Sequence, residues 1–113
     1  MANSTNPLQD QIKALRDKYV AELPQKIRVI EEAWEMLDKN RWNAEDLTRV
    51  ERLVHTLVGS GATFGVPEVS QRAREMETAL KLLQIAGAKQ STDARARILP
   101  MLDSLMRAAI KGQ

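Results

Sequence analysis

Apolar residues recur at alternating intervals of three and four along nearly the whole chain, and this spacing constrains the fold more than any other feature. Such intervals place side chains on one face of an α-helix, whereas a half-buried strand needs an interval of two. The five stripes are Leu8, Ile12, Leu15 and Tyr19; Ile27, Ile30, Trp34 and Leu37; Leu47, Val50, Val54, Leu57, Gly61 and Phe64; Val69, Ala73, Met76, Leu80 and Leu83; and Ile98, Leu102, Leu105 and Ala109. They predict five amphipathic helices.

Polar caps and prolines predict where these helices begin and end. Asn6 precedes Pro7, and Asn43 precedes two acids within three positions, both of which are patterns of helix N-termini. We expect Pro24 to separate the first helix from the second, because proline disfavours helix in the residue before it. Pro100 lies inside the last stripe. Since the periodicity resumes beyond it, we expect a kink there rather than a break.

Short connections between these helices predict how they pack. Only two residues separate Phe64 from Pro67, so the helices on either side must be antiparallel neighbours. The expected fold is all-α: an antiparallel up-down four-helix bundle of the second to fifth helices, with an additional N-terminal helix packing over one end. This domain is expected over residues 7–111, after a disordered lead-in of residues 1–6.

Composition excludes several classes of function. The 113 residues include no cysteine, which excludes disulfides and thiolate chemistry. No apolar run approaches the roughly 18 residues that span a bilayer, and the N-terminus lacks the regions of a signal peptide. We therefore expect a cytoplasmic protein without a membrane partner. The net charge is only +2, with basic and acidic residues interspersed, so no nucleic-acid partner is expected.

The only histidine, His55, lies within the third stripe's helix but off its apolar face. At about 100° per residue the imidazole points roughly 130° away from the stripe, toward solvent or a partner. Two glycines follow, although each costs about 1 kcal/mol relative to alanine inside a helix. We expect Gly59 to leave the ring open to approach and Gly61 to allow close packing of another helix. A surface histidine without a role, followed by a fraying helix end, explains the pattern equally well.

The segment that begins with this histidine, HTLVGSGATFG over residues 55–65, resembles the signature of histidine-containing phosphotransfer (HPt) domains of two-component phosphorelays. That signature reads roughly His-x-Leu-Lys-Gly-Ser-x-x-x-hydrophobic-Gly. The matching residues are His55, Leu57, Gly59, Ser60, Phe64 and Gly65, together with Ala73, Met76 and Glu77 on the next helix. The resemblance extends over roughly residues 8–110. It departs at Val58, where the family usually has lysine.

The resemblance implies a phosphorelay carrier. His55 would accept a phosphoryl group from the phospho-aspartate of a response-regulator receiver domain and pass it to another receiver aspartate. The histidine is then a substrate and carrier, and the domain is not a stand-alone catalyst. No cofactor or metal is expected on this chain, because Mg²⁺ belongs to the receiver. The implied partners are receiver domains, with a hybrid histidine kinase as a further candidate, and we expect a monomer.

Helix geometry groups the residues that are expected to surround the phosphorylated ring. The expected docking face comprises Glu51, Arg52, His55, Val58, Gly59 and Ala62. Alternatively, Val58 only extends the core. Because the usual lysine is missing, Arg52, or Arg72 or Arg74 on the adjacent helix, is a candidate to stabilise the phosphoryl charge. A solvated arginine is the more common case for each.

Other functions compete with this interpretation. An HPt-fold adaptor or regulatory module with weak or no transfer is favoured only by Val58. Phosphorylation by a neighbouring kinase domain, as in chemotaxis-type kinases, would place the ATP-binding domain elsewhere. A metal site could use only one histidine and carboxylates. Gly59-Ser60-Gly61 lacks the Gly-x-Ser-x-Gly spacing of a serine hydrolase.

Overall fold

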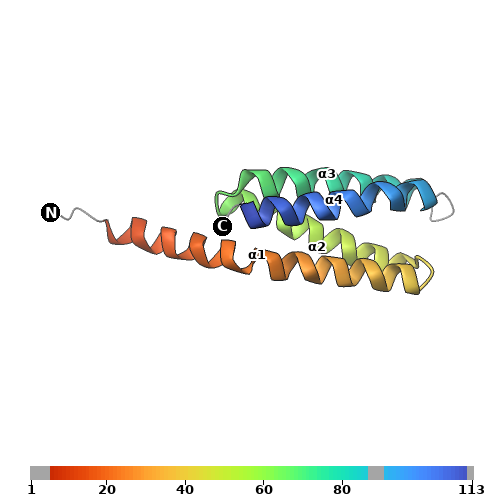
Figure 1. Cartoon of the computed structure of the whole chain (residues 1–113), viewed down its shortest axis with the longest axis horizontal. Coiled ribbons are helices and arrows are strands. Elements are labelled where there is room, and N and C mark those ends of the chain that lie inside the picture. Colours follow the sequence, from red (N-terminus) through yellow and green to blue (C-terminus); the bar gives the residue numbers. More distant parts are fainter. Residues whose placement is uncertain (1–5, 87–90, 112–113) are drawn as a thin grey trace.

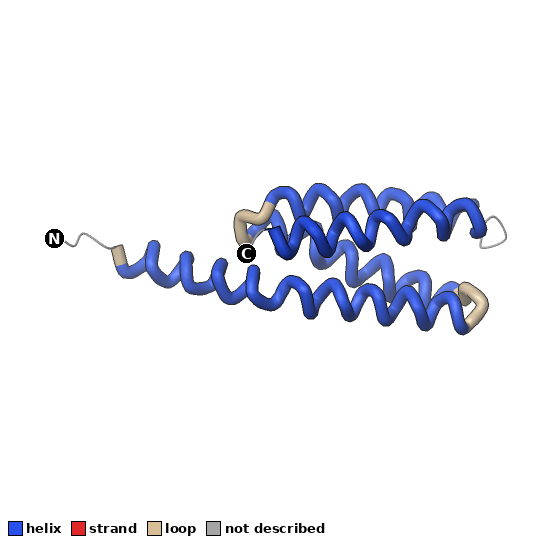
Figure 2. Tube along the Cα trace, viewed as in Figure 1, coloured by secondary structure: helices blue, strands red, loops and turns tan. Residues whose placement is uncertain are grey.

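The computed structural model describes residues 6–86 and 91–111. In this part of the chain the elements are α1 (Pro7–Lys39), α2 (Ala44–Thr63), α3 (Pro67–Ala86) and α4 (Ser91–Lys111). Each helix packs against its neighbours in the sequence, and α1 also contacts α4, so the four helices close a ring. Figures 1 and 2 show them aligned along one long axis, with the chain reversing direction between successive helices. The all-helical bundle predicted from the spacing is confirmed.

The apolar stripes meet in one core inside this ring. The largest fully buried side chains are Leu23, Ile27, Ile30, Leu37, Val50, Val54, Val69, Met76, Leu80, Ile98 and Leu105. Burying each such side chain stabilises the fold by roughly 1.5–3 kcal/mol. Burial of these stripes therefore orients each helix, with its polar face toward solvent.

The first two predicted helices form one helix, so the prediction of a break at Pro24 was wrong. α1 runs for 33 residues, with Pro24 in its interior. An interior proline costs about 3 kcal/mol, because it lacks an N–H and crowds the preceding turn. Leu23 and Ile27 flank this position and are fully buried, and their burial offsets that cost. By contrast, α4 continues through Pro100 without a break, as predicted, and the kink expected there stays a prediction.

The predicted packing of a separate N-terminal helix over the end of the bundle is not found either. The N-terminal part of α1 projects beyond the other three helices (Figure 1). Its stripe residues Leu8, Ile12 and Leu15 are exposed, whereas Tyr19 is the first that the bundle buries. Apart from Asn6, the expected lead-in over residues 1–6 lies outside the described residues.

Asparagine side chains cap α1 and α2 as predicted. Asn6 Oδ1 accepts a hydrogen bond from the backbone N–H of Leu8, and Asn43 Oδ1 accepts one from that of Asp46 at 2.8 Å. Arg41 and Trp42, in the turn before α2, adopt φ values of 59° and 61°. This left-handed conformation is rarely adopted by residues other than glycine. The Trp42 ring packs edge-on against Trp34, and its indole N–H donates to Asp38, and these contacts stabilise the turn.

A glycine makes the tight turn between α2 and α3. Gly65 has a φ of +71°, which glycine adopts without steric cost. The N–H of Val66 then donates to the Gly61 carbonyl oxygen at 2.8 Å, which satisfies an acceptor at the end of α2. This turn directs α3 back along α2, as the short connection predicted.

Leucine-to-alanine substitutions on either side of the bundle's edge test the course of α1. Leu23→Ala should lower the free energy of unfolding by about 2–5 kcal/mol, because it leaves a cavity in the core. Leu15→Ala is the matched control on the projecting part, where the side chain is 57% exposed, and should change it by about 0.5 kcal/mol or less. Urea denaturation measures both. A loss at Leu15 equal to that at Leu23 would show that the projecting part is packed.

Candidate functional site

The side chain of His55 lies on the outer face of α2 and is 71% exposed. The core side of the same helix carries Val54 and Leu57, both buried. The structure thus confirms the prediction that the imidazole faces away from the apolar stripe. An exposed neutral imidazole is a nucleophile near neutral pH.

A carboxylate on α3 fixes one nitrogen of this ring. His55 Nδ1 donates to Glu77 Oε2 at 2.5 Å. The Glu77 side chain is only 12% exposed, whereas the ring is largely accessible. With the Nδ1 proton held by Glu77, the lone pair of the neutral ring resides on Nε2. The arrangement therefore orients the imidazole and presents one nitrogen as a nucleophile.

Lys81, one turn further along α3, belongs to the same group. Its Nζ lies 4.0 Å from the same Glu77 oxygen that accepts from His55. The sequence indicated Glu77 only as one of the residues that match the family, and it gave no indication of Lys81. An available signal was the position of an acid directly beside the stripe residue Met76, where a buried carboxylate requires a partner.

The two glycines of α2 lie in different surroundings. A Cβ added at Gly59 would have no heavy-atom neighbour within 4 Å, so the surface one turn after His55 is open. A Cβ at Gly61 would lie 3.0 Å from the backbone nitrogen of Ser70 and 3.2 Å from its Cα. The Ser70 hydroxyl, in turn, donates to the carbonyl oxygen of Val58 at 2.7 Å. Gly61 thus permits close contact between α2 and α3.

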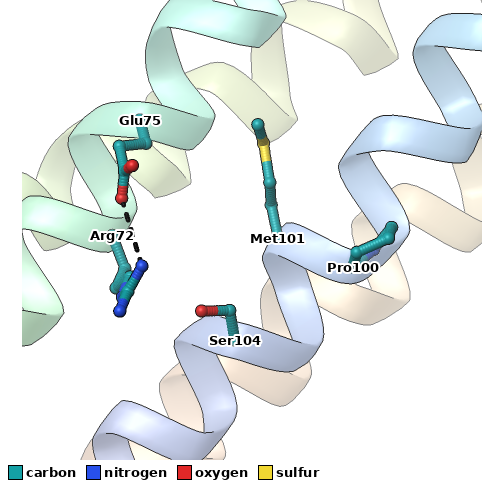
Figure 3. Close-up of a pocket in the computed structure, with 5 residues that line it drawn as sticks. All are labelled: Arg72, Glu75, Pro100, Met101 and Ser104. Carbon is teal, nitrogen blue, oxygen red and sulfur yellow. Dashed lines mark ion pairs between the residues drawn. The ribbon is translucent and has the colours of Figure 1, made fainter.

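The three arginines considered for phosphate binding occupy different surroundings. Arg72 forms ion pairs with Glu68 and Glu75 and lines a small pocket of about 160 Å³ with residues of α4. Figure 3 shows its side chain beside Glu75 and Ser104. Among the described residues α4 makes no contact with α2, so this position does not bring Arg72 to His55. Arg72 lies five residues before Glu77, and this spacing places the two side chains about 140° apart around α3.

Arg52 and Arg74 remain candidates. Both are exposed, Arg52 one turn before His55 on α2 and Arg74 one turn before Glu77 on α3. Among the described residues, no ion pair fixes either guanidinium. Their side chains are therefore free to approach a group on the ring.

The expected docking face is exposed at Arg52, Gly59 and Ala62 and half-buried at Glu51. Val58 is only 9% exposed and belongs to the core. Its side chain therefore offers a partner little surface, which favours the alternative that Val58 extends the core. Val58 is buried because it lies on the side of α2 that faces α3.

An apolar groove lies on the opposite side of His55, between α1 and α2. Its volume is about 320 Å³, and it is lined by Tyr19, Lys26, Val29, Ile30, Leu53, Thr56, Leu57, Ser60 and Phe64. Thr56 directly follows His55, so the groove borders the ring's surroundings. Sequence reasoning missed this groove, because it depends on how α1 lies against α2.

Metal ligands do not gather at this site. In residues 6–85 and 96–111, whose side chains the structure describes, no three His, Cys, Asp or Glu side chains are close enough together to hold a metal ion. None of the helices in these ranges combines the length and the apolar character needed to cross a membrane.

Comparison with protein families identifies the family of this chain. Residues 14–111, nearly the whole sequence, match the family model described as Hpt domain. The chain belongs to the Hpt domain family. Membership implies a phosphorelay carrier role in two-component systems, with receiver domains and kinases as partners. Comparison with curated proteins gave no match, and comparison with solved structures gave none.

Exchanging each glycine of α2 for alanine tests the packing of this Hpt domain. Gly61→Ala should lower the free energy of unfolding by about 1–3 kcal/mol, because its Cβ meets the backbone of Ser70. Gly59→Ala, the matched control, should raise it by up to about 1 kcal/mol through helix propensity. Chemical denaturation checks both values. A destabilising Gly59→Ala, or a neutral Gly61→Ala, would contradict the structure.

An aromatic pair anchors α1 beside the site. The rings of Tyr19 and Phe64 stack with centroids 4.6 Å apart, and the hydroxyl groups of Tyr19 and Ser60 share a hydrogen bond of 2.6 Å. Burial raises the pKa of the Tyr19 phenol above its ordinary value, and the bond to Ser60 partly offsets that increase. The contact joins α1 to the end of α2 that carries the glycines.

Alkaline titration of the Hpt domain tests this environment. Tyr19 is the only tyrosine, so tyrosinate absorbance reports its pKa alone. Because the folded pKa lies above the unfolded one, the neutral phenol's contribution to stability is present below about pH 10. It is lost as the pH rises through the folded pKa. Ser60→Ala should raise that pKa further, since the Ser60 bond lowers it. A midpoint no higher than that of the denatured chain would refute the assignment.

Proposed function

We propose that this Hpt domain accepts a phosphoryl group on Nε2 of His55 from a receiver phospho-aspartate and donates it to another receiver aspartate. The hydrogen bond between His55 Nδ1 and Glu77 carries the proposal. It holds the proton on one nitrogen, orients the ring and leaves the other nitrogen accessible on an exposed helix face. The open surface at Gly59 supports the approach of a partner to this nitrogen.

The transfer step follows from this tautomer. The Nε2 lone pair attacks the phosphorus atom, an N–P bond forms, and the P–O bond to the receiver aspartate breaks. The electron pair of that bond remains on the aspartate carboxylate. The ring becomes positively charged, and the Glu77 carboxylate, which accepts from Nδ1, stabilises that charge. Transfer to the second receiver reverses these steps.

Positioning and charge account for most of the catalysis in such a transfer, because the transition state is loose. The receiver is expected to bring Mg²⁺, while α2 and α3 present the ring in a fixed orientation. We infer that the receiver covers Arg52, Gly59 and Ala62 and extends toward the groove between α1 and α2. An apolar groove beside exposed polar residues is suited to a transient interface.

Transfer from a phosphorylated receiver tests the carrier role. The wild-type domain should acquire acid-labile, base-stable phosphate when mixed with a labelled receiver, and His55→Gln should acquire none. Label on both proteins would place the phosphoryl group elsewhere. Binding of receivers without any labelling of His55 would favour the adaptor function, for which Val58 in place of the family's lysine remains the only sequence argument.

Replacing Glu77 tests its role in orienting and stabilising the ring. Glu77→Gln can still accept from Nδ1 but lacks the charge, so the rate of transfer should fall roughly tenfold, which corresponds to one charge-assisted hydrogen bond. Glu75→Gln is the matched control, because Glu75 lies on the same helix but pairs with Arg72. Rapid-quench measurements of transfer compare the three proteins. Equal rates for wild type and Glu77→Gln would remove Glu77 from the mechanism.

Arg52 is proposed to stabilise the phosphoryl group as the receiver approaches. It is exposed on the helix turn that precedes His55, within the inferred docking face. Arg52→Ala should therefore slow transfer severalfold without changing stability. Unchanged transfer kinetics would exclude this role.

A further inference from the structure

A phosphoryl group on His55 creates an electrostatic problem at this site. It adds about two negative charges beside a ring whose other nitrogen already contacts the buried carboxylate of Glu77. Glu51, half-buried one turn earlier on α2, adds another acid to the surroundings. Val58 is apolar and buried, so the helix turn after His55 supplies no cation. A positive group close to the ring is needed to offset these charges.

Lys81 is the cation that the structure places nearest to the ring through described contacts. Its Nζ and His55 Nδ1 both lie close to Glu77 Oε2, at 4.0 Å and 2.5 Å. The two nitrogens are therefore no further apart than these distances taken together, 6.5 Å. The Lys81 side chain is 57% exposed, so it is free to turn toward the outer nitrogen of the ring.

The other cations around the site have no comparable contact. Arg52 and Arg74 are exposed, and no ion pair among the described residues directs them to the ring. Lys26 belongs to α1 and lines the groove between α1 and α2, where its Nζ is 5.9 Å from the centroid of the Tyr19 ring. Arg72 faces α4. Lys81 alone among these shares an acceptor with His55.

We propose that Lys81 binds the phosphoryl group carried by His55. This inference rests on the proposed function. An ammonium group has three donors, so Nζ can contact a phosphoryl oxygen while it remains near Glu77. Lys81, on α3, supplies the positive charge that is missing on α2, where Val58 replaces the family's usual lysine. Glu77 then has two tasks, since it holds the ring through Nδ1 and keeps Lys81 beside it.

The test uses the whole domain labelled on His55 with the small phosphoryl donor phosphoramidate, so that no receiver is needed. Phosphorus NMR follows the titration of the phosphoryl group in wild type, Lys81→Met and Lys81→Arg. Lys13→Met, on the projecting part of α1, is the matched control. Arg52→Met and Arg74→Met compare the other cations. Proton NMR of unlabelled protein follows the His55 imidazole in parallel.

Contact with Lys81 should lower the pKa of the phosphoryl group, because a nearby cation favours its dianion. Lys81→Met should raise that pKa by roughly half a unit and slow transfer from a receiver about threefold to tenfold. Lys81→Arg should restore most of both effects, and Lys13→Met should match wild type. The imidazole titration of unlabelled Lys81→Met should change less than the phosphoryl titration.

Several outcomes would overturn the proposal. Identical phosphoryl titrations for wild type and Lys81→Met, with normal transfer from a receiver, would remove Lys81 while leaving the carrier function intact. A shift only in Arg52→Met or Arg74→Met would assign the contact to that arginine. A change confined to the unlabelled imidazole would show that Lys81 acts only through Glu77. Failure of His55 to take the label would remove both proposals, whereas a Lys81-dependent titration without receiver transfer would remove the carrier function alone.

Discussion

The close contact between α2 and α3 at Gly61 fixes the position of everything else at the site. The backbone of Ser70 lies where a side chain at position 61 would begin, and the Ser70 hydroxyl bonds to the carbonyl oxygen of Val58. From this contact, His55 lies six residues back along α2 and Glu77 seven residues on along α3, or about 9 Å and 10.5 Å at 1.5 Å per residue. Because the two helices run in opposite directions, the ring and the carboxylate arrive at the same level. A glycine six residues from the histidine therefore determines which α3 side chain can reach it.

Burial makes the pairing of His55 and Glu77 necessary for the fold as well as useful for chemistry. A carboxylate that is largely removed from water is costly unless it is paired and hydrogen-bonded. Glu77 has the ring nitrogen and the Lys81 ammonium on one oxygen, and both partners are exposed enough to remain hydrated. The negative charge of Glu77 thus lies at the edge of the core, whereas the imidazole and the Lys81 ammonium lie in solvent. That division keeps the ring oriented while its outer nitrogen stays accessible.

Sequence periodicity predicted most of the bundle, and its errors, which all concern α1, have a specific cause. The caps at Asn6 and Asn43, the limits of α2 and α3 and the exposure of His55 follow from local rules that act within a few residues. At Pro24 a local rule was given too much weight: Leu23 lies four residues from both Tyr19 and Ile27, so the apolar stripe continues through the proline. Tertiary burial outweighed the local penalty. The hydrogen bond between His55 and Glu77, and with it the proximity of Lys81 to the ring, depends on the register and rotation of α3 against α2, which no spacing within one helix reveals.

The two sides of His55 differ in a way that restricts how a receiver can approach. On the α3 side, Glu77 Oε2 accepts from the ring nitrogen and lies 4.0 Å from the Lys81 ammonium, so Glu77 and Lys81 form a charged pair beside the ring. On the α1 side, the groove is largely apolar, and its hydroxyl groups at Tyr19 and Ser60 are already bonded to each other. Contact of an apolar partner on the α3 side would bury a charged pair, which is unfavourable. Contact on the α1 side would bury apolar surface, which is favourable. A partner that brings its aspartate to Nε2 should therefore rest on α1 and α2 and leave Lys81 free to follow the phosphoryl group.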